Sequence, residues 1–158
     1  MSDQTTPQFR NLLLEEQLCF ALCRANRAIT RTFGRRLEPM GLSHSQYLVM
    51  LALWEENGLS ASRLAARVNL DPSSLTPILK RLEAMNLVRR VRPKDNQRTV
   101  LVRLTAAGRD LQPCTADIQR AVADATGLSG EDLAQLRAVL HKLADTLQKD
   151  EDRQTDVA

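Results

Sequence analysis

The chain has 158 residues and a net charge of +3, and this length suits one compact domain with long helical extensions. It contains no apolar run long enough to cross a membrane, and its first residues lack the basic and apolar segments of a signal peptide. Its three cysteines have no metal-ligand spacing, so we expect a cytoplasmic protein in a reducing environment, with no membrane, metal or cofactor partner.

The charges are distributed unevenly along the chain. Residues 60–110 contain eleven Lys and Arg against four Asp and Glu, a balance of +7, whereas the rest contains eleven against fifteen, a balance of −4. A basic segment within an acidic frame favours a polyanionic partner such as double-stranded DNA.

The first predicted element is a long amphipathic helix from about Leu12 to Leu37, and we expect residues 1–42 to form an N-terminal dimerisation helix. Pro39 and Gly41 end it, since both residue types interrupt helices. Apolar side chains recur along one stripe of this helix: Leu14, Leu18, Leu22, Ala25, Ile29 and Phe33.

A helix-turn-helix is predicted next. Ser43 is a suitable N-cap for a second helix that runs through Trp54, and Ser60 is a suitable N-cap for a short third helix. A turn then leads to the N-cap Asp71, with Pro72 at the first helical position, where a missing N–H costs nothing. A short helix, a tight turn and a second helix are the parts of a helix-turn-helix.

The helix after Asp71 has the pattern of a DNA recognition helix. Its apolar face consists of Leu75, Ile78, Leu79 and Leu82. Its polar face carries Ser73, Ser74, Thr76, Lys80 and Arg81. Short polar side chains let a backbone approach base edges in the major groove, while cations meet phosphates. Taken alone, this segment is equally compatible with an ordinary amphipathic surface helix.

A strand pattern replaces the helical pattern after Asn86. Residues 88–92 and 99–104 are rich in β-branched side chains, and residues 93–98 separate them as a hairpin loop. This wing makes residues 43–105 a winged helix-turn-helix DNA-binding module, with the cations of its loop placed to reach phosphates or the minor groove. The predicted DNA-binding residues are Arg63, Ser73, Ser74, Thr76, Lys80, Arg81, Lys94 and Arg98.

We expect residues 106–158 to form C-terminal dimerisation helices. Thr105 caps a fifth helix that Pro113 is expected to kink, and Ser129 begins a last helix with a capping box. The module is too small to cover the apolar stripes of its flanking helices, so a two-fold homodimer is predicted, reading a pseudo-palindromic site. The fold class is therefore mainly α with a small β wing. The stripe of the last helix consists of Leu133, Leu136, Val139, Leu140, Leu143 and Leu147.

Four stretches of the sequence are similar to one known family: Gln46–Trp54, Leu75–Glu83, Arg98 and Val102–Gly108. Through them the chain resembles the MarR family of bacterial transcriptional regulators over nearly its whole length. The resemblance implies a dimeric regulator, acting as a repressor, that a small molecule releases from its operator.

Within that family, Gln17–Leu22 is similar to the reactive-cysteine segment of the organic-hydroperoxide-sensing branch. In that branch, two tyrosines of the partner subunit are hydrogen-bonded to the reactive thiolate, and the matching positions here are Phe33 and His44. A second cysteine that some members use is replaced by Ala121. The usual Asp-x-Arg of the wing is also altered, because Asn96 stands in the place of the aspartate.

Two effector classes remain open. Cys19 could be oxidised as a thiolate by an organic hydroperoxide. Alternatively, a crevice between the dimer helices and the DNA-binding module could hold a small aromatic or organic acid, with His44 as cation and hydrogen-bond donor for the carboxylate and nearby aromatic rings as walls. The lost tyrosines favour the acid. A third interpretation is that Cys19 is simply a small core residue, since buried cysteines usually are. Tyr47 and Trp54 are equally compatible with the core, and for Trp54 the core is the better interpretation. The candidate residues for effector or redox sensing are Cys19, Cys23, Phe33, His44, Tyr47 and Trp54.

The sequence does not predict an enzyme. A cysteine hydrolase would need a Cys–His pair oriented by a third polar group, together with oxyanion donors. No glycine-rich turn, nucleophile elbow or phosphate loop supplies them, and His141 falls on the polar surface of the last predicted helix.

Overall fold

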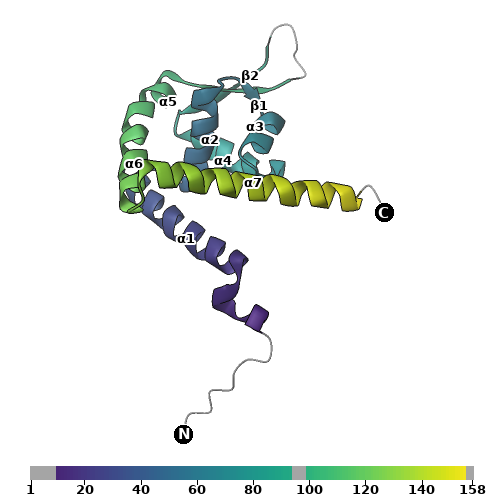
Figure 1. The fold of residues 1–158 in the computed structure, drawn as a ribbon. Coiled ribbons are helices and arrows are strands. Elements are labelled where there is room, and N and C mark those ends of the chain that lie inside the picture. The colour runs from purple at the N-terminus through teal and green to yellow at the C-terminus, as the bar shows by residue number, and fades with distance from the viewer. Residues whose placement is uncertain (1–9, 94–98, 156–158) are drawn as a thin grey trace. The chain divides into compact units, whose positions relative to one another are not determined.

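The computed structural model describes residues 10–93 and 99–155, which form a mainly helical protein with one small sheet (Figure 1). Lys94 and Arg98 lie outside the described residues. The chain divides into two compact units, residues 1–119 and residues 120–158. The α-helices are α1 (Leu18–Leu37), α2 (His44–Glu55), α3 (Ala61–Arg67), α4 (Pro72–Ala84), α5 (Ala106–Asp110), α6 (Gln112–Ala125) and α7 (Gly130–Thr155). The strands are β1 (Leu59–Ser60), β2 (Val88–Val91) and β3 (Leu101–Leu104), and the 3₁₀ turns are η1 (Arg10–Leu12), η2 (Leu14–Glu16) and η3 (Glu38–Met40).

Helix α1 begins at Leu18, so the predicted start at about Leu12 is wrong. The turns η1 and η2 precede it, and the backbone is extended at Leu13 (ψ 132°) and again at Gln17 (ψ 121°). The Gln17 amide Nε2 donates to the carbonyl oxygens of Asn11 and Leu13 at 2.6 and 3.0 Å. It thereby satisfies carbonyls that a continuous helix would have bonded. The leucine spacing suggested a continuous helix because a 3₁₀ turn has about three residues, which is close to the repeat of an α-helix.

Helices α2, α3 and α4 begin at the predicted N-caps. The hydroxyl of Ser43 accepts a hydrogen bond from the backbone N–H of Gln46 at 3.2 Å, and the Gln46 side chain accepts from the Ser43 N–H at 2.8 Å. These two bonds form a capping box. The Ser60 hydroxyl accepts from the N–H of Arg63 at 3.3 Å. Asp71 occupies the N-cap of α4 without a side-chain capping bond.

The sheet has three antiparallel strands in the order β1-β3-β2, one more than the predicted wing. Val102 of β3 lies between Leu59 of β1 and Arg90 of β2 in the register. The side-chain carbonyl of Asn57 accepts a hydrogen bond from the Leu104 N–H at 2.9 Å, which joins the turn before β1 to β3. A strand of two residues has no periodicity, so only its pairing with β3 identifies it.

The core of the first unit lies between these strands and helices α2, α3 and α4, which Figure 1 shows gathered beneath the strands. The apolar face predicted for α4 supplies three of the core residues, and Ile78 packs against them while partly buried. The recognition helix is therefore fixed to the unit by its apolar face. The fully buried core side chains are Leu37, Met50, Leu53, Leu59, Leu64, Leu75, Leu79, Leu82, Val49, Val88 and Val102.

The predicted fifth helix is divided into α5 and α6, and the break falls at Leu111. Pro113 lies in the first turn of α6, where its missing N–H removes no helical hydrogen bond. In the second unit, the Ser129 hydroxyl accepts from the N–H of Asp132 at 3.1 Å and donates to the Asp132 carboxylate at 2.7 Å. The predicted cap of α7 is confirmed, but the return bond of a full capping box is replaced by this carboxylate contact.

Candidate functional site

Helix α4 presents its polar face to solvent, as expected from its sequence. The side chains of this exposed face are Ser73, Ser74, Thr76, Lys80 and Arg81. Leu75, Leu79 and Leu82 on the opposite face are at most 2 % exposed. The helix is therefore anchored from behind and offers hydroxyls and two cations to a partner, an arrangement that suits a major groove.

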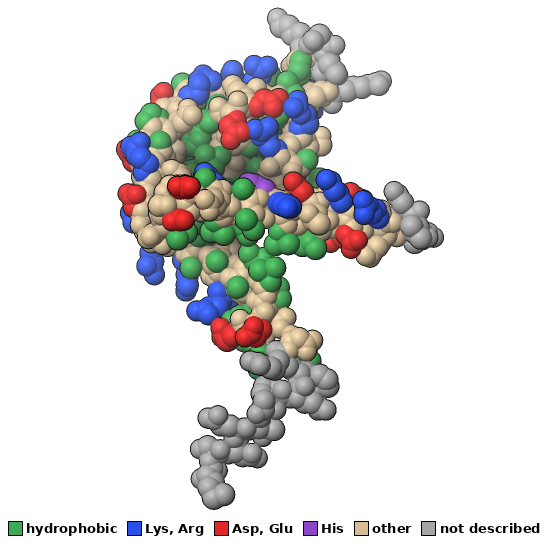
Figure 2. Space-filling model, in the orientation of Figure 1, with side chains coloured by type: hydrophobic (Ala, Val, Ile, Leu, Met, Phe, Trp, Pro, Cys, Tyr) green, Lys and Arg blue, Asp and Glu red, His purple; other side chains and the backbone are tan. Residues whose placement is uncertain are grey.

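The strands next to α4 add a second group of cations. Arg89 on β2 and Arg103 on β3 lie directly opposite each other, and both are exposed. Like charges in this position repel each other, so an anion beside them is favoured. Arg90 lies next in β2, and its Nε is 3.7 Å from the Glu83 carboxylate. Figure 2 shows Lys and Arg side chains gathered along the edge of the first unit that carries the strands.

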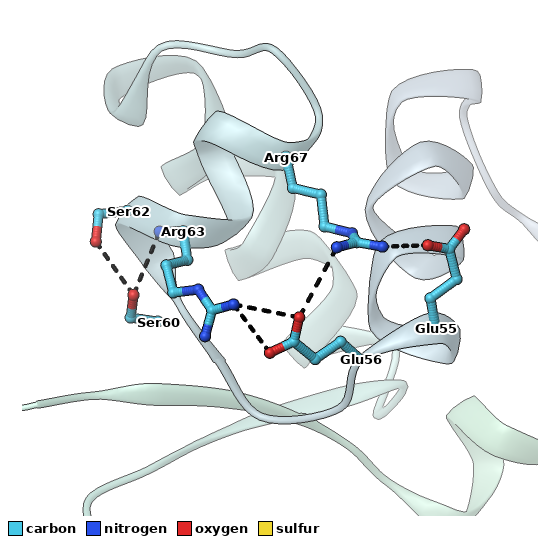
Figure 3. A network of polar contacts seen from close by, with 6 residues as sticks. All are labelled: Glu55, Glu56, Ser60, Ser62, Arg63 and Arg67. Carbon is cyan, nitrogen blue, oxygen red and sulfur yellow. Dashed lines mark hydrogen bonds and ion pairs between the residues drawn. The ribbon is translucent and has the colours of Figure 1, made fainter.

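Arg63 pairs with the Glu56 carboxylate at the end of α2 (Figure 3). Its guanidinium lies 3.1 Å from the Glu56 carboxylate, and Arg67 pairs with both Glu55 and Glu56. All four side chains are substantially exposed, so the network is open to solvent. The sequence led us to expect a cation available for DNA at Arg63, whereas the structure shows one already paired within the chain.

A cavity of about 560 Å³ lies between α4 and the wing. Thr76 of the predicted DNA-binding set lies on its wall, so this residue faces the wing side of α4. Arg90 of β2 and Arg92, just after that strand, border the same cavity. The lining residues are Ala61, Pro72, Leu75, Thr76, Leu79, Arg90, Arg92 and Val100.

A second cavity, an open groove of about 530 Å³, lies on the other side of α4. We call it the His44 groove. It is bordered by α1, by η3 and the loop after it, by the start of α2 and by one residue of α4. Its ionisable side chains are Glu38, His44 and Arg81. The full lining is Thr30, Gly34, Glu38, Gly41, Leu42, Ser43, His44, Gln46 and Arg81.

His44 also belongs to a cluster of three rings. The Phe33 ring lies 5.3 Å from the His44 ring and 5.2 Å from the Tyr47 ring, measured between centroids. Burial lowers the pKa of His44 and raises that of Tyr47. Burial therefore favours the neutral form of the imidazole, a hydrogen-bonding group, over the cation that the sequence suggested.

The other candidate residues lie apart from this cluster. Trp54 is ten residues further along α2, a rise of about 15 Å, and its indole N–H donates to the Gly108 carbonyl at 2.8 Å. It joins α2 to α5, which favours a core role for Trp54 over a wall of the effector site. Cys19 and Cys23 are exposed, and Cys19 precedes Phe33 by fourteen residues of α1, or about 21 Å. Within one chain, neither thiol reaches His44.

Sequence reasoning missed Glu38 as a groove residue and missed that Arg81 faces the groove. Glu38 has no predicted role, and Arg81 is predicted only as a DNA-facing cation. A finer helical projection would have found Arg81, because it lies on the flank of α4 shared with Ile78 rather than opposite the buried leucines.

Among residues 10–93 and 99–155, no three His, Cys, Asp or Glu side chains gather where they could hold a metal ion. Within the same ranges, no helix is both long and apolar enough to cross a membrane. The described residues form a basic face on α4 and the wing, the cavity beside it and the His44 groove. These are binding surfaces.

Comparison with known proteins identifies what these surfaces belong to. Residues 42–100 match the MarR family. The organic hydroperoxide resistance transcriptional regulator of Bacillus subtilis is 36 % identical over 140 residues. The match covers 89 % of this chain and 95 % of the Bacillus protein. A structure of reduced AbfR bound to DNA has a TM-score of 0.71 at 31 % identity, covering 85 % of this chain and 92 % of that one.

CouR from Rhodococcus jostii RHA1, solved bound to p-coumaroyl-CoA, has a TM-score of 0.73 at 26 % identity, covering 84 % of this chain and 95 % of that chain. The Bacillus relative is a transcriptional regulator, and two of the matched AbfR structures are bound to DNA. The winged helix-turn-helix predicted from the sequence is therefore confirmed. The chain belongs to the MarR family of DNA-binding transcriptional regulators and is not an enzyme.

Proposed function

We propose that this regulator is a homodimeric repressor of a pseudo-palindromic operator and that a small aromatic or organic acid in the His44 groove releases it. The observation that carries the proposal is the position of the groove, which is bordered by α1, α2 and the recognition helix α4. A ligand that contacts all three helices binds differently when α4 moves, and differential binding is what shifts a conformational equilibrium.

For DNA, we propose that α4 lies in the major groove and the wing lies over the adjacent minor groove. The polar residues of α4, together with Lys94 and Arg98, would supply the phosphate and base contacts, and Arg63 would join them where it leaves the Glu56 carboxylate. The exposed cations on β2 and β3 support this docking, since phosphate contacts dominate affinity for DNA.

For assembly, we propose that residues 1–42 and 106–158 form the dimer around a module of residues 43–105. Large apolar side chains are exposed in each unit taken alone, on the N-terminal segment and on α7, and Figure 2 shows apolar surface along both. Contiguous exposed apolar surface favours a protein interface. These side chains are Leu12, Leu14, Leu18, Ile29, Leu136, Val139, Leu140 and Leu147.

For the effector, the proposal rests on the polar and apolar groups that converge on the groove. Leu42 offers an apolar wall, while Thr30 and Ser43 offer hydroxyls. A cavity of about 530 Å³ has the size of a small-molecule site. The relative CouR binds p-coumaroyl-CoA, which is an aromatic acyl thioester, and this also favours an aromatic ligand here.

The test is release of an operator fragment, followed by fluorescence anisotropy, against a panel of aromatic monocarboxylates and organic hydroperoxides. Wild type and Cys19→Ser should both be released by at least one acid. Failure of every acid with wild type would contradict the proposal.

The second candidate is an organic-hydroperoxide sensor that is released by oxidation of Cys19. It is favoured by the exposure of that thiol and by the similarity to the Bacillus regulator. Because Cys19 is far from His44 within one chain, activation of the thiolate would need groups from the partner subunit. Release by cumene hydroperoxide in wild type, lost in Cys19→Ser while no acid works, would establish this candidate instead.

A further inference from the structure

Helix α1 carries a row of arginines that the proposed function does not use. The helix contains five arginines and no aspartate or glutamate. Three of them, Arg27, Arg31 and Arg35, follow one another at intervals of four residues, and all three are exposed. Residues four apart lie one above the other on a helix, so these three positions form a line about 12 Å long. We call them the α1 arginine row.

The row has no acidic partner within the described part of the chain. Every ion pair there joins other residues, and the one arginine of α1 that takes part is Arg24, 3.6 Å from the Glu15 carboxylate. Glu38, the next acidic residue along the chain, forms no ion pair with the row. Like charges one turn apart destabilise a helix, so an anion lying along the row would stabilise it.

The surface next to the row is also polar. A shallow hollow of about 430 Å³ lies on α1, and two guanidiniums of the row border it together with an amide and a hydroxyl. These groups are hydrogen-bond donors that suit an anion. The lining residues are Asn26, Arg27, Thr30 and Arg31.

The row points away from the surfaces described above. At about 100° per residue it lies nearly opposite the apolar stripe that contains Leu18 and Ile29, which the proposed dimer covers. Figure 2 shows Lys and Arg side chains along one side of α1 and apolar side chains along the other. Within the first unit, α1 extends from the end opposite the strands (Figure 1). A duplex held by α4 and the wing therefore leaves the row uncovered.

We propose that the α1 arginine row is a second DNA-binding surface, which holds the phosphates of a duplex other than the operator. Over about 12 Å, one DNA strand presents about three to four phosphates, which matches three guanidiniums. A guanidinium also binds phosphate with two parallel hydrogen bonds. Phosphate contacts carry no base information, so this surface binds DNA of any sequence.

An acidic protein fits this surface less well than DNA does. The centre of a protein interface is apolar and poor in charge, whereas the row is cationic and the hollow beside it is lined by polar side chains. A dimer with one row on each subunit can hold an operator and a second duplex at once. On one long DNA the second duplex is present at high effective concentration, so the row favours looping of DNA near the operator.

The test asks whether protein bound to its operator captures a second duplex. An operator fragment on beads is saturated with the full-length protein, washed and mixed with a labelled duplex of unrelated sequence at several salt concentrations. The row variant replaces three arginines by glutamine, which retains a high helix propensity. The control removes three exposed cations from the side of α7 opposite its apolar stripe. The row variant is Arg27→Gln, Arg31→Gln, Arg35→Gln, and the control variant is Lys142→Gln, Lys149→Gln, Arg153→Gln.

Wild type and the control variant should both capture the second duplex. The row variant should capture it at least ten-fold more weakly, and the plot of log affinity against log salt should lose about three units of slope, roughly 0.9 for each phosphate contact. Its operator affinity, measured by fluorescence anisotropy, should equal that of wild type and so show that the fold is intact.

Three results would overturn the second surface. They are no capture by wild type, equal capture by wild type and the row variant, and a row variant that loses operator affinity as well, which would place the row on the operator itself. In the first case, polyglutamate that binds wild type but not the row variant would assign the row to an acidic protein. Capture needs no effector, so failure of every acid to release the operator would contradict the proposed function and leave this inference standing.

Discussion

His44 illustrates how burial changes the role of a single side chain. Desolvation lowers the pKa of its imidazole in the folded protein, so between the folded and unfolded pKa values the unfolded chain binds more protons. Above about pH 6.5, the pKa of the imidazole in the unfolded chain, His44 is neutral in both states and costs no stability. The free energy of unfolding decreases as the pH falls from that value through the lower pKa of the folded protein.

We expect the free energy of unfolding to decrease from pH 7.5 to pH 5, and part of this slope should disappear in His44→Gln. Urea titrations at each pH measure it. His141→Gln is the control, because His141 lies on the exposed surface of α7. An identical slope in His44→Gln and wild type would contradict a desolvated imidazole.

Gly108 lies where the backbone of another segment approaches too closely for a side chain. A Cβ at this position would lie 2.1 Å from the carbonyl oxygen of Leu87, and that oxygen accepts the backbone N–H of Thr105 at 3.1 Å. The Trp54 indole also bonds the Gly108 carbonyl. Any shift of Gly108 therefore disturbs the joint between α2, α5 and β2.

Gly108→Ala should lower the free energy of unfolding by about 1–3 kcal/mol or more, the usual cost of overpacking. Gly34→Ala is the matched control: its Cβ meets nothing, and alanine favours a helix interior over glycine by about 0.5–1 kcal/mol. Chemical denaturation of both variants compares them. Equal free energies of unfolding for Gly108→Ala and wild type would mean that α5 can move away from the start of β2 at no cost.

At the scale of elements, the network at the end of α2 sets how much charge α3 offers to DNA. Glu56 neutralises Arg63 and shares Arg67 with Glu55, so both arginines pair with this one carboxylate. Each ion pair is exposed and worth little for stability. We infer that its larger effect is on DNA affinity.

Glu56→Gln should bind DNA more tightly, and the plot of log affinity against log salt should become steeper by up to about one unit, since one freed arginine adds one phosphate contact. Glu131→Gln on α7 removes the same charge outside the module and should change neither quantity. Unchanged affinity and slope in Glu56→Gln would show that α3 does not approach phosphates.

Lys80 tests the docking of α4 by the loss of a cation, whereas Glu56→Gln tests α3 by freeing one. It lies on the outward line of the helix, is exposed and has no part in the groove lining. Lys80→Gln should weaken operator binding and reduce the salt slope by about one unit, as for the loss of one phosphate contact. A slope equal to that of wild type would remove the major-groove docking of α4.

At the scale of the whole molecule, the exposed stripe of α7 makes assembly testable. Leu140 is 36 % exposed and Val139 63 % exposed in the chain alone. A helix that keeps a row of such side chains usually buries them against a partner. We therefore expect operator binding to depend on assembly, because two recognition helices reach two half-sites only in a dimer.

Leu140→Glu should shift the protein toward monomer in analytical ultracentrifugation and weaken operator binding strongly. Ala138→Glu introduces the same charge on the opposite side of α7 and should remain dimeric. If both variants assemble like wild type, the dimer contact lies away from this stripe.

The sequence by itself determined the helix caps, the order of the elements and the polar face of α4, because each depends on residues within one or two turns. Ser43, Ser60 and Ser129 were all found at the helix starts they predict. The wing followed from a change of period, and the MarR resemblance from residues that the comparison confirmed.

Only the tertiary structure decided which of these residues meet. Arg81 and His44 border one groove, Trp54 bonds Gly108 rather than an effector, and Leu59 pairs with Val102 to form β1. Each contact joins segments that are far apart along the chain, and no periodicity within either segment specifies its partner. The packing of helices on a sheet specifies it, because burying one apolar face of α4 sets where both of its flanks point.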